Sequence, residues 1–533
     1  MAAKLNKFTN DDIESVHGQI EMYRALYEGK HYEVFPRAKQ LIRQGEIIGA
    51  INYGSMNSSD MKVPYVMANI SKMIVDVPSM FINRSLGKVL TNKQREFEEF
   101  EENEEITIEE LELLKEQQQG FIDNIVENTN LIKWNSMNLK QWQIDGGIVA
   151  VPEIVNGNPR IAFKERTAYY ELDDGVTYQM RYILSDDEDN KYLHVHEEVE
   201  HDNYVEGTHT LYSYNNTATE LTEVEDDDII QELTNINAEN RHYILHNRNK
   251  TLFIYLPFEP TFNNQMGNSA IKGQEGKQDE VNWTLTRTAQ VFERNGRPRV
   301  AIPKDVFREI QDRAEERYGD RNKIDNQDLE VTSIDEDGQS IRVLQIDTDK
   351  IGDVSYLKNI IKLMLMETQT SEKAIDFFNS EASSYAQSGT AKFYDLFLSI
   401  IKAEKLRDEY VDFLQRALRN CLWLYKQVDN RVEIELPDIK QSEMLPITSK
   451  ERREMNNQSY QAGTQSLEQT IKNINPEKTE AWVENELEKI EGEKSTVDSF
   501  SLFNGNQTSR NFNDNRNEDG QHIDENGNVI EEW

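Results

Sequence analysis

Hydrophobic residues recur at helical spacing in the first 90 residues, with interruptions, and this pattern predicts helices there. A helix starting at Asn10 or Asp11 would align the apolar side chains of residues 13–27, which are Ile13, Val16, Ile20, Tyr23 and Tyr27. A second apolar stripe ends before Pro78 and consists of Val66, Ile70, Met73, Ile74 and Val77. We therefore expect two amphipathic helices in this region.

The next stretch is strongly acidic and then becomes helical again. Residues 94–118 contain so many Glu residues that we expect a solvated, partly mobile helix or loop. A carboxylate metal site is the alternative, but no neighbouring His or fixed turn would select a metal. Residues 121–146 return to a helical pattern.

The spacing of hydrophobic residues changes at about residue 146, where apolar and polar residues begin to alternate. The turn-forming sequences NGN, DDG and DDEDN separate the alternating runs. The segment 146–258 is therefore predicted to be a β-rich unit of antiparallel strands.

Two helical patterns follow, separated by a small insert. The first, residues 268–295, aligns Val281, Leu285, Thr288 and Phe292 and stops at an Asn-Gly pair. The insert, 296–350, reads as a strand, a short amphipathic helix and a hairpin across Glu336, Asp337 and Gly338. The second helix, 353–373, carries an apolar stripe made of Leu357, Ile360, Ile361, Met364 and Leu365.

Residues 379–393, NSEASSYAQSGTAKF, are mostly small and polar and precede the longest helical pattern of the chain. That pattern continues for about 38 residues without Gly or Pro, far beyond the usual 11 to 12, and would span roughly 57 Å. After it we expect a strand ending at Pro437, amphipathic helices over 449–493 with a break at Pro476, and a disordered tail from 494.

Composition and charge restrict the possible functions. The 533 residues favour more than one domain, and the hydrophobic content of 37% favours an elongated or oligomeric protein. A net charge of −38 argues against tight nucleic-acid binding but permits loose contact with DNA. The single cysteine, Cys421, excludes an intramolecular disulfide and is expected in the core. No apolar segment resembles a signal or membrane span, so we expect a soluble, intracellular protein or one carried inside a particle made in the cell.

The sequence contains no complete catalytic motif. The segment GQEGKQ lacks the spacing of a phosphate-binding loop, and GNSAI, 267–271, lacks the GxSxG pattern, so helix initiation by Asn268 or Ser269 explains it better. His194, His196 and His201 do not have zincin spacing. His194 and His196 would share a strand face, where a metal site is the alternative to a solvated hairpin. We expect no catalytic residue, bound metal or cofactor.

Basic residues gather in and around the insert. Arg294, Arg297, Arg299, Arg308, Arg313, Arg317 and Arg321 are interleaved with acids. They can form ion pairs on a helix surface, or they can provide a docking surface with a few phosphate contacts.

The order of these parts resembles the portal proteins of tailed bacteriophages, particularly long-tailed phages of Gram-positive hosts. The resemblance covers almost the whole chain and includes YVMANISKMIVDVPSMFI, GNSAI, SYAQSGTAKFYDLF and LPITSKERREMNNQSYQAGTQSLEQTI. It implies an α+β, mainly helical ring subunit with wing, stem, clip and crown regions. The acidic block and the Asn-rich tail depart from the pattern.

The resemblance assigns a role to each region. The implied regions are the wing, 1–265; two stem helices, 268–295 and 353–373; the clip, 296–350; the tunnel loop, 377–391; the long wing helix, 388–428; the crown with its adjoining segment, 429–493; and the tail, 494–533. The loop would contact DNA backbone weakly through short polar side chains, because tight contacts would slow DNA movement.

The resemblance also implies site residues and partners. The loop residues facing DNA would be Asn379, Ser380, Ser383, Ser384, Gln387 and Ser388. Stem and clip contacts would come from Lys272, Lys277, Arg297, Arg299, Arg308, Arg313 and Arg317. The implied partners are eleven further copies in a dodecamer, double-stranded DNA, the large terminase subunit, the head–tail adaptor, and the major capsid and scaffolding proteins. No membrane is implied. The location would be the portal vertex of the virion after assembly in the host cytoplasm.

Two alternatives remain open at this point. One is another ring-forming virion scaffold or baseplate protein that does not pass DNA. The other is a metal-dependent hydrolase that uses the His194 and His196 cluster.

Overall fold

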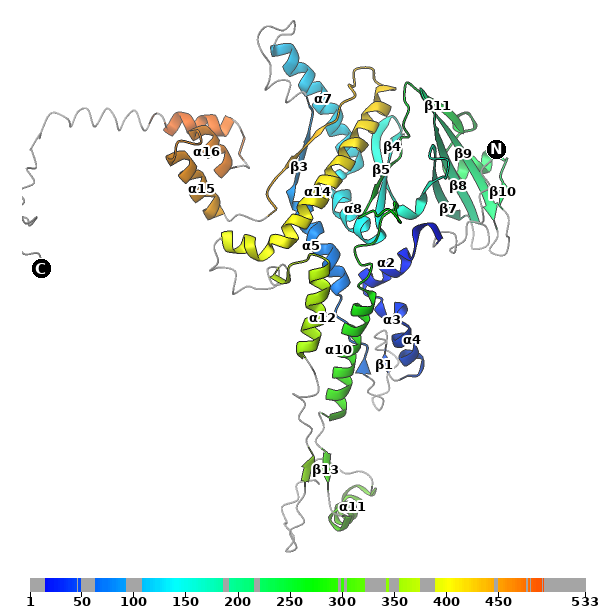
Figure 1. Ribbon diagram of the computed structural model, residues 1–533, viewed down its shortest axis with the longest axis vertical. Helices are drawn as coiled ribbons and strands as arrows, with labels where there is room; N and C mark the ends of the chain where they lie inside the picture. Colours follow the sequence, from blue (N-terminus) through cyan, green and yellow to red (C-terminus); the bar gives the residue numbers. More distant parts are fainter. Residues whose placement is uncertain are drawn as a thin grey trace, which may run out of the picture. The chain divides into compact units, whose positions relative to one another are not determined.

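The computed structural model describes residues 15–45, 47–48, 63–92, 108–185, 191–214, 221–295, 299–301, 304–321, 342–344, 354–373, 389–444, 449–475, 478–479, 481–490 and 492. Helices and strands are both abundant among them (Figure 1), which confirms the predicted mixed α+β fold. The helices are α2 (Ile20–Glu28), α3 (His31–Val34), α4 (Pro36–Arg43), α5 (Ile70–Ser85), α7 (Ile108–Thr129), α8 (Leu131–Asp145), α9 (Asp227–Thr234), α10 (Glu275–Asn295), α11 (Lys304–Tyr318), α12 (Val354–Glu367), α14 (Gly389–Lys426), α15 (Ser449–Gln461) and α16 (Leu467–Ile474).

The described strands form five sheets of two to six strands each. They are β1 (Ile47–Ile48), β2 (Val63–Pro64), β3 (Leu86–Leu90), β4 (Gly147–Val155), β5 (Asn158–Glu165), β6 (Tyr169–Glu171), β7 (Thr177–Ser185), β8 (Lys191–Glu200), β9 (Tyr204–Tyr214), β10 (Thr222–Glu223), β11 (His242–His246), β12 (Ile254–Pro257), β13 (Arg299–Ala301), β14 (Arg342–Leu344) and β15 (Asp438–Gln441). The predicted β-rich segment contains two antiparallel sheets, ordered β12-β4-β5 and β10-β9-β8-β7-β6, and β11 also pairs with β9.

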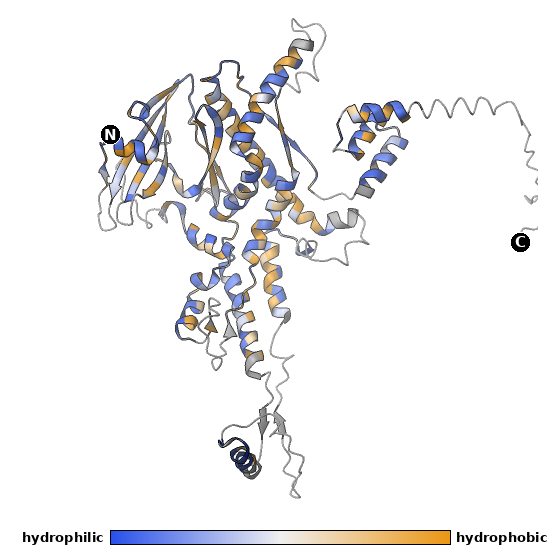
Figure 2. Cartoon of the chain, turned by 180° about the vertical axis from the view of Figure 1, so that it is seen from behind, coloured by the Kyte–Doolittle hydropathy of each residue, from blue (hydrophilic) through white to orange (hydrophobic). Residues whose placement is uncertain are grey.

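The long helix α14 is the centre of the larger of two compact units, Met1–Leu445. One face of α14 packs on α5, α7 and the β12-β4-β5 sheet, and the residues Tyr410, Phe413 and Cys421 are fully buried in this core. The core position predicted for Cys421 is confirmed. Most helices show both apolar and polar residues in Figure 2, as expected for helices with one buried side.

Near the N-terminus, one predicted helix is interrupted and another continues beyond its predicted apolar stripe. Gly18 adopts a left-handed conformation with φ +77°, so residues 15–17 and α2 form separate helical segments. Pro78 does not end α5, which continues to Ser85. Ile74, Val75 and Ile82 are completely buried around it, and this packing outweighs the roughly 3 kcal/mol cost of an interior proline.

The acidic block is not wholly solvated, contrary to expectation. Residues 93–107 lie outside the described structure, but α7 begins at Ile108 and its Leu111 is buried. Gln118 is also buried, and its amide nitrogen donates to the Glu433 carbonyl and the Glu435 carboxylate at 2.9 and 3.0 Å. The end of the block is therefore fixed to the segment that follows α14.

The segment after α14 also differs from its predicted structure. Residues 432–437 form no strand, and β15 begins after Pro437, where it pairs antiparallel with β3. The loop is anchored by side chains instead, because Val432 is fully buried and the Gln415 amide donates to the Pro437 carbonyl at 2.8 Å.

We expected the GNSAI segment to start a helix, but it does not. It is a tightly packed junction instead. Gly267 has φ +87°, and a Cβ there would lie 2.3 Å from the Gly146 carbonyl oxygen. The Asn268 N–H donates to the Phe258 carbonyl at 2.7 Å, and the Arg166 guanidinium donates to the Gly267 carbonyl at 3.0 Å. The segment thus joins α8, the three-stranded sheet and the start of α10, which begins later, at Glu275.

Helix α10 presents an uncharged polar stripe to the body of the unit. Gln278, Asn282 and Thr286 are four residues apart and fully buried. Thr286 Oγ1 both accepts from the Val66 N–H and donates to the Val66 carbonyl, at 3.0 and 3.1 Å. Asn282 accepts from the Ala68 N–H at 3.3 Å, and the Gln278 amide donates to the Ala68 carbonyl at 2.7 Å. The side chains thereby pair a non-helical backbone segment as a neighbouring strand would.

The same stripe fixes a buried histidine. The Asn282 amide donates to His31 Nδ1 at 2.8 Å, so His31 Nε2 carries the proton donated to the Leu26 carbonyl at 2.7 Å. Burial lowers the pKa of His31, which keeps the ring neutral. Asn282 therefore connects α10 to both the segment before α5 and the start of α3.

Helix α12 packs beside α10 in a shared apolar cluster. The predicted α12 stripe is confirmed by the buried Ile360, Met364 and Leu365, and α10 contributes Val281. The predicted α10 stripe is only partly correct, because Phe292 is half exposed. In the insert between these helices, β13 pairs antiparallel with β14, and α11 lies between them in sequence. The predicted hairpin turn at 336–338 lies outside the described residues.

The smaller unit, Pro446–Trp533, contains α15, α16 and a further helical segment, 481–490. Ser466 caps α16 by accepting a hydrogen bond from the Gln469 N–H at 3.2 Å. Helices were predicted here, but Pro476 and the tail from residue 494 lie outside the described residues.

Replacing Asn282 with Ala should lower the free energy of unfolding by about 2 to 3 kcal/mol, because buried groups on Ala68, His31 and Gln278 would lose a partner. Urea unfolding followed by circular dichroism would measure the change. The matched control is Asn128→Ala, since Asn128 is exposed and its side chain donates only to a neighbouring Asn on α7. Equal, small effects of both substitutions would contradict a structural role for the stripe.

Candidate functional site

The loop residues predicted to contact DNA lie outside the described structure. They are Asn379, Ser380, Ser383, Ser384, Gln387 and Ser388, within the undescribed segment 374–388. The structure describes both ends of that segment, α12 with the residues after it and the start of α14. The candidate site is therefore the junction that holds these two ends.

Polar contacts join the two ends directly. Ser399 Oγ, on α14, accepts a hydrogen bond from the Ser371 N–H at 2.7 Å, and Ser371 Oγ donates to the Asp395 carbonyl. Ser371 and Ser399 are buried. Ser371, just after α12, is therefore held against the amino-terminal part of α14.

A buried lysine strengthens this junction. Lys402, on α14, donates through Nζ to the Thr368 carbonyl at 2.8 Å, just after the last turn of α12. A cation at the carboxyl end of a helix interacts favourably with the helix dipole. Burial lowers the pKa of Lys402 to about 8, because the charged ammonium loses hydration that one carbonyl does not replace.

The two lysines predicted as stem contacts are paired at the start of α10. Lys277 Nζ lies 2.6 Å from the Glu367 carboxylate at the end of α12, and hydrogen bonds from Lys277 and Gln274 lower the pKa of Glu367. Lys272 donates to the Asn268 side chain at 2.7 Å. Lys277 therefore lies where α10 begins and α12 ends, and Lys272 lies in the segment just before α10.

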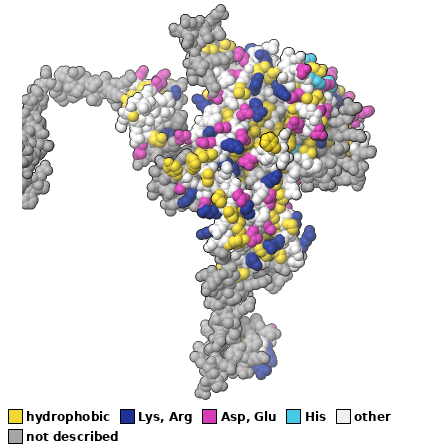
Figure 3. All heavy atoms as spheres, viewed as in Figure 1, with side chains coloured by type: hydrophobic (Ala, Val, Ile, Leu, Met, Phe, Trp, Pro, Cys, Tyr) yellow, Lys and Arg dark blue, Asp and Glu magenta, His cyan; other side chains and the backbone are white. Residues whose placement is uncertain are grey.

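The predicted arginines occupy the insert. Arg299 lies in β13, Arg308, Arg313 and Arg317 lie on α11, and Arg297 lies outside the described residues. Arg308 is exposed. Arg321 forms ion pairs with Asp312 and Glu315 at 2.9 and 2.6 Å. Surface ion pairs are therefore present in the insert, as the simpler interpretation of its charges predicts. The face of the molecule drawn in Figure 3 likewise shows acidic and basic side chains interspersed.

The histidine cluster of the six-stranded sheet is largely covered, which corrects the expectation of a solvated hairpin face. His194 is buried, and His196 and His209 are half-buried and line a cleft with it. His194 and His196 share a face of β8 with His209 of β9. His194 Nε2 lies 3.2 Å from His209 Nδ1, and the rings of His196 and His209 stack with centroids 3.9 Å apart. His201 lies apart from these three and stacks on Tyr204.

A hydrogen-bonded chain extends from His196 to a buried carboxylate. His196 Nε2 lies 2.6 Å from the Tyr243 hydroxyl, which donates to Glu198 at 2.8 Å. Glu198 also accepts from the Leu252 N–H at 2.7 Å. Burial raises the pKa of Glu198, although these hydrogen bonds oppose the shift.

Burial also keeps the imidazoles neutral. It lowers the pKa values of His194 and His209 to about 4, with mutual repulsion adding to the effect at His194. The pKa of His196 is lowered well below its usual value for the same reason. Neutral rings can coordinate metals, but among the described residues no group of three or more His, Cys, Asp or Glu side chains is placed to hold a metal ion.

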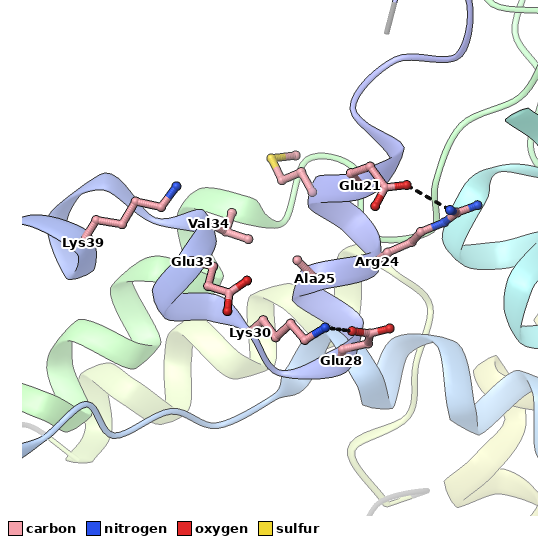
Figure 4. A pocket seen from close by; sticks show the side chains of 9 residues that line it. Glu21, Arg24, Ala25, Glu28, Lys30, Glu33, Val34 and Lys39 are labelled. Carbon is pink, nitrogen blue, oxygen red and sulfur yellow. Dashed lines mark hydrogen bonds and ion pairs between the residues drawn. The ribbon is translucent and has the colours of Figure 1, made fainter. Parts of the chain in front are cut away.

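Described residues of the larger unit line a recess and a cleft. A recess of about 610 Å³ lies against α2 and α3, with Met22, Ala25 and Val34 among charged residues (Figure 4). Four of its charged residues form ion pairs, Arg24 with Glu21 at 2.9 Å and Lys30 with Glu28 at 2.5 Å. A larger cleft of about 1440 Å³ runs from α8 and the β4–β5 hairpin to β7 and β8. Neither hollow contains a set of side chains that defines a reaction.

Sequence reasoning missed the Ser371, Ser399 and Lys402 contacts. Lys402 interrupts an apolar stretch of the long helical pattern, and this irregularity is the only local signal of a buried charge. The two serines carry no recognisable signal, because their partners are 24 to 28 residues away in sequence.

No helix in the described part of the chain is both long enough and apolar enough to cross a bilayer. No protein-family model matches the sequence, and no curated protein does.

The chain is similar to two solved structures. One is from the virion of a native gene transfer agent (GTA) particle, with a TM-score of 0.42 and 9% identity over 76% of this chain and 89% of that chain. The other is from the neck of an empty GTA particle computed with C6 symmetry, with a TM-score of 0.40 and 7% identity over 75% and 88% of the two chains. At these values, the function has to be argued from this chain's own residues.

Lowering the pH from 7 to 5 should destabilise the protein partly through the histidine cluster. Each ring with a folded-state pKa near 4 stays neutral, whereas the unfolded chain gains a proton below about pH 6.5, so stability falls between pH 6.5 and 4. Over this pH step, the free energy of unfolding measured with urea should fall by about 2 kcal/mol less in His209→Phe than in the wild type. The exposed His246→Gln serves as control. An unchanged pH dependence in His209→Phe would contradict this account.

Proposed function

We propose that this chain is the subunit of a portal-type ring at one vertex of a phage capsid. In this proposal, twelve copies enclose a passive, non-enzymatic channel for double-stranded DNA during genome packaging and ejection. The observation that carries the proposal is the junction of α12 and α14. Its contacts at Ser371, Ser399 and Lys402 hold together the two helices that flank the small, polar segment 374–388 in sequence.

The order of elements supports this proposal. Helices α10 and α12 correspond to the two stem helices implied by the sequence resemblance, and the β13–α11–β14 insert corresponds to the clip. Helix α14 follows the loop and extends from Gly389 to Lys426. The resemblance and this arrangement together favour a portal over a ring scaffold or baseplate protein, for which no specific contact in the described residues provides support.

The charge of the chain suits a DNA channel with weak contacts. A net charge of −38 per copy would repel DNA over most of the protein surface. The small polar residues of 379–388 would then provide short-lived contacts with the DNA backbone. Lysines and arginines of the stem and clip would act as isolated attractive points or in docking.

The remaining partners follow from the same proposal. The insert, with its arginines on α11, would contact the large terminase subunit during packaging and the head–tail adaptor afterwards. The outer surface would contact the major capsid and scaffolding proteins. The protein would be assembled in the host cytoplasm and retained in the virion.

Purified protein should form rings with an axial hole wide enough for duplex DNA. Negative-stain electron microscopy would show the hole, and particle mass measured in parallel should be near twelve times 62.2 kDa. Assembly with the capsid and scaffolding proteins is the second condition to test, because the proposed ring belongs to a capsid vertex. Compact monomers or dimers under both conditions would contradict the proposal.

Replacing Ser383, Ser384 and Ser388 together with Arg should slow or stall DNA packaging while rings still form. The added positive charges would bind DNA phosphates tightly in the channel. Packaged DNA protected from nuclease would be measured in particles carrying the variant. The same three positions changed to Ala form the matched control, which should package normally. Normal packaging by the Arg variant would contradict the proposed role of the loop.

A further inference from the structure

Phe262 is the most exposed large hydrophobic residue in the described part of the chain. Its exposed fraction is 104%, so its ring makes almost no contact with the rest of its own chain. Scattered exposed apolar residues are common on protein surfaces, but most retain partial cover. A fully exposed aromatic ring is suited to bury its whole surface in a partner.

Several hydrogen bonds hold the turn that carries Phe262 in place. Thr261 and Asn264 exchange two backbone hydrogen bonds, each 3.0 Å long. The Asn264 side chain donates to the Gly267 carbonyl at 2.7 Å, and the Asn268 side chain donates to the Glu259 carbonyl at 3.0 Å. These contacts fix the turn to the buried GNSAI junction. A side chain presented in this way loses little conformational entropy on binding.

The surroundings of Phe262 in sequence are uncharged. No charged residue occurs between Pro260 and Ile271, in a chain in which 29% of residues are charged. Because each copy carries a net charge of −38, two copies repel each other through most of their surface. An uncharged, apolar projection is therefore the kind of surface through which this chain can contact itself.

The turn begins beside α14, where further apolar side chains are exposed. Burial lowers the pKa of Lys402 on α14, and the negative charge of the nearby Glu259 carboxylate opposes that shift, so Glu259 lies close to this helix. On the same part of α14, Leu398 and Ile401 are 54% and 47% exposed. They could extend the contact formed by the aromatic ring.

We propose that Phe262 is the anchor of a contact with a second copy of this chain. This inference rests on the proposed ring and names the residue that holds neighbouring copies together. In a ring of identical copies, each interface joins one surface of a copy to a different surface of its neighbour. Phe262 of one copy therefore inserts into a different surface of the next copy and does not meet the partner's Phe262.

A substitution series tests the anchor. Phe262→Ala should raise the protein concentration needed for half-maximal assembly by about tenfold or more, the scale expected for a central aromatic anchor. Phe262→Trp, which retains a large aromatic ring, should assemble nearly as well as the wild type. As dilute monomers, both variants should keep the wild-type melting temperature, because the Phe262 side chain is exposed in the single copy. Analytical ultracentrifugation over a range of concentrations would measure assembly.

Photo-crosslinking tests the identity of the partner. The full chain with p-benzoylphenylalanine at position 262 would be mixed with isotope-labelled wild type and irradiated. Mass spectrometry should find position 262 linked to a labelled peptide, which shows contact between copies. A link only within one copy, or no link in assembled protein, would overturn the inference.

The outcomes separate this inference from the proposed function. If rings form and Phe262→Ala assembles like the wild type, the anchor is wrong and the ring proposal stands. If the wild type forms another oligomer that crosslinks between copies through position 262, the ring proposal fails and the contact stands. If the protein stays monomeric without crosslinks, both fail.

Discussion

The pairing of α10 with the backbone before α5 is the interaction on which the arrangement of the larger unit depends. Gln278, Asn282 and Thr286 satisfy peptide groups of Val66, Ala68 and Ser71 that have no strand or helix partner. Unpaired peptide groups in a buried position would each cost about 1 to 3 kcal/mol. The stripe therefore fixes the position and rotation of α10 more specifically than apolar packing alone, since hydrogen bonds require particular distances and directions.

The position of α12 follows from that of α10, and α12 is in turn connected to α14. Val281 packs with Met364 and Leu365, and Lys277 pairs with Glu367, so α12 is held against α10 along an apolar cluster and at one end by charge. Ser371 and Lys402 then tie the segment after α12 to α14, which is itself buried in the main core. The two helices that flank residues 374–388 in sequence are thus anchored in different apolar cores.

The charges of the protein divide into two groups with different consequences. Most charged side chains of the described residues are exposed, in a chain whose net charge is −38. A few are buried and have specific partners, including Lys402 at a helix end and Glu198 in the histidine network. Buried groups of this kind restrict the fold to one arrangement, because any shift would leave a charge without its partner.

The sequence by itself determined the local elements. The extent of α14, the helices on either side of the insert, the β-rich segment and the buried position of Cys421 were predictable from period and composition, since these depend on neighbouring residues. Only the tertiary structure decided the continuation of α5 through Pro78, the junction role of GNSAI, the burial of the histidines and the partners of Ser371 and Lys402. Those features depend on contacts between residues far apart in sequence, and the side chains that make them are polar, so hydrophobic periodicity carries no record of them.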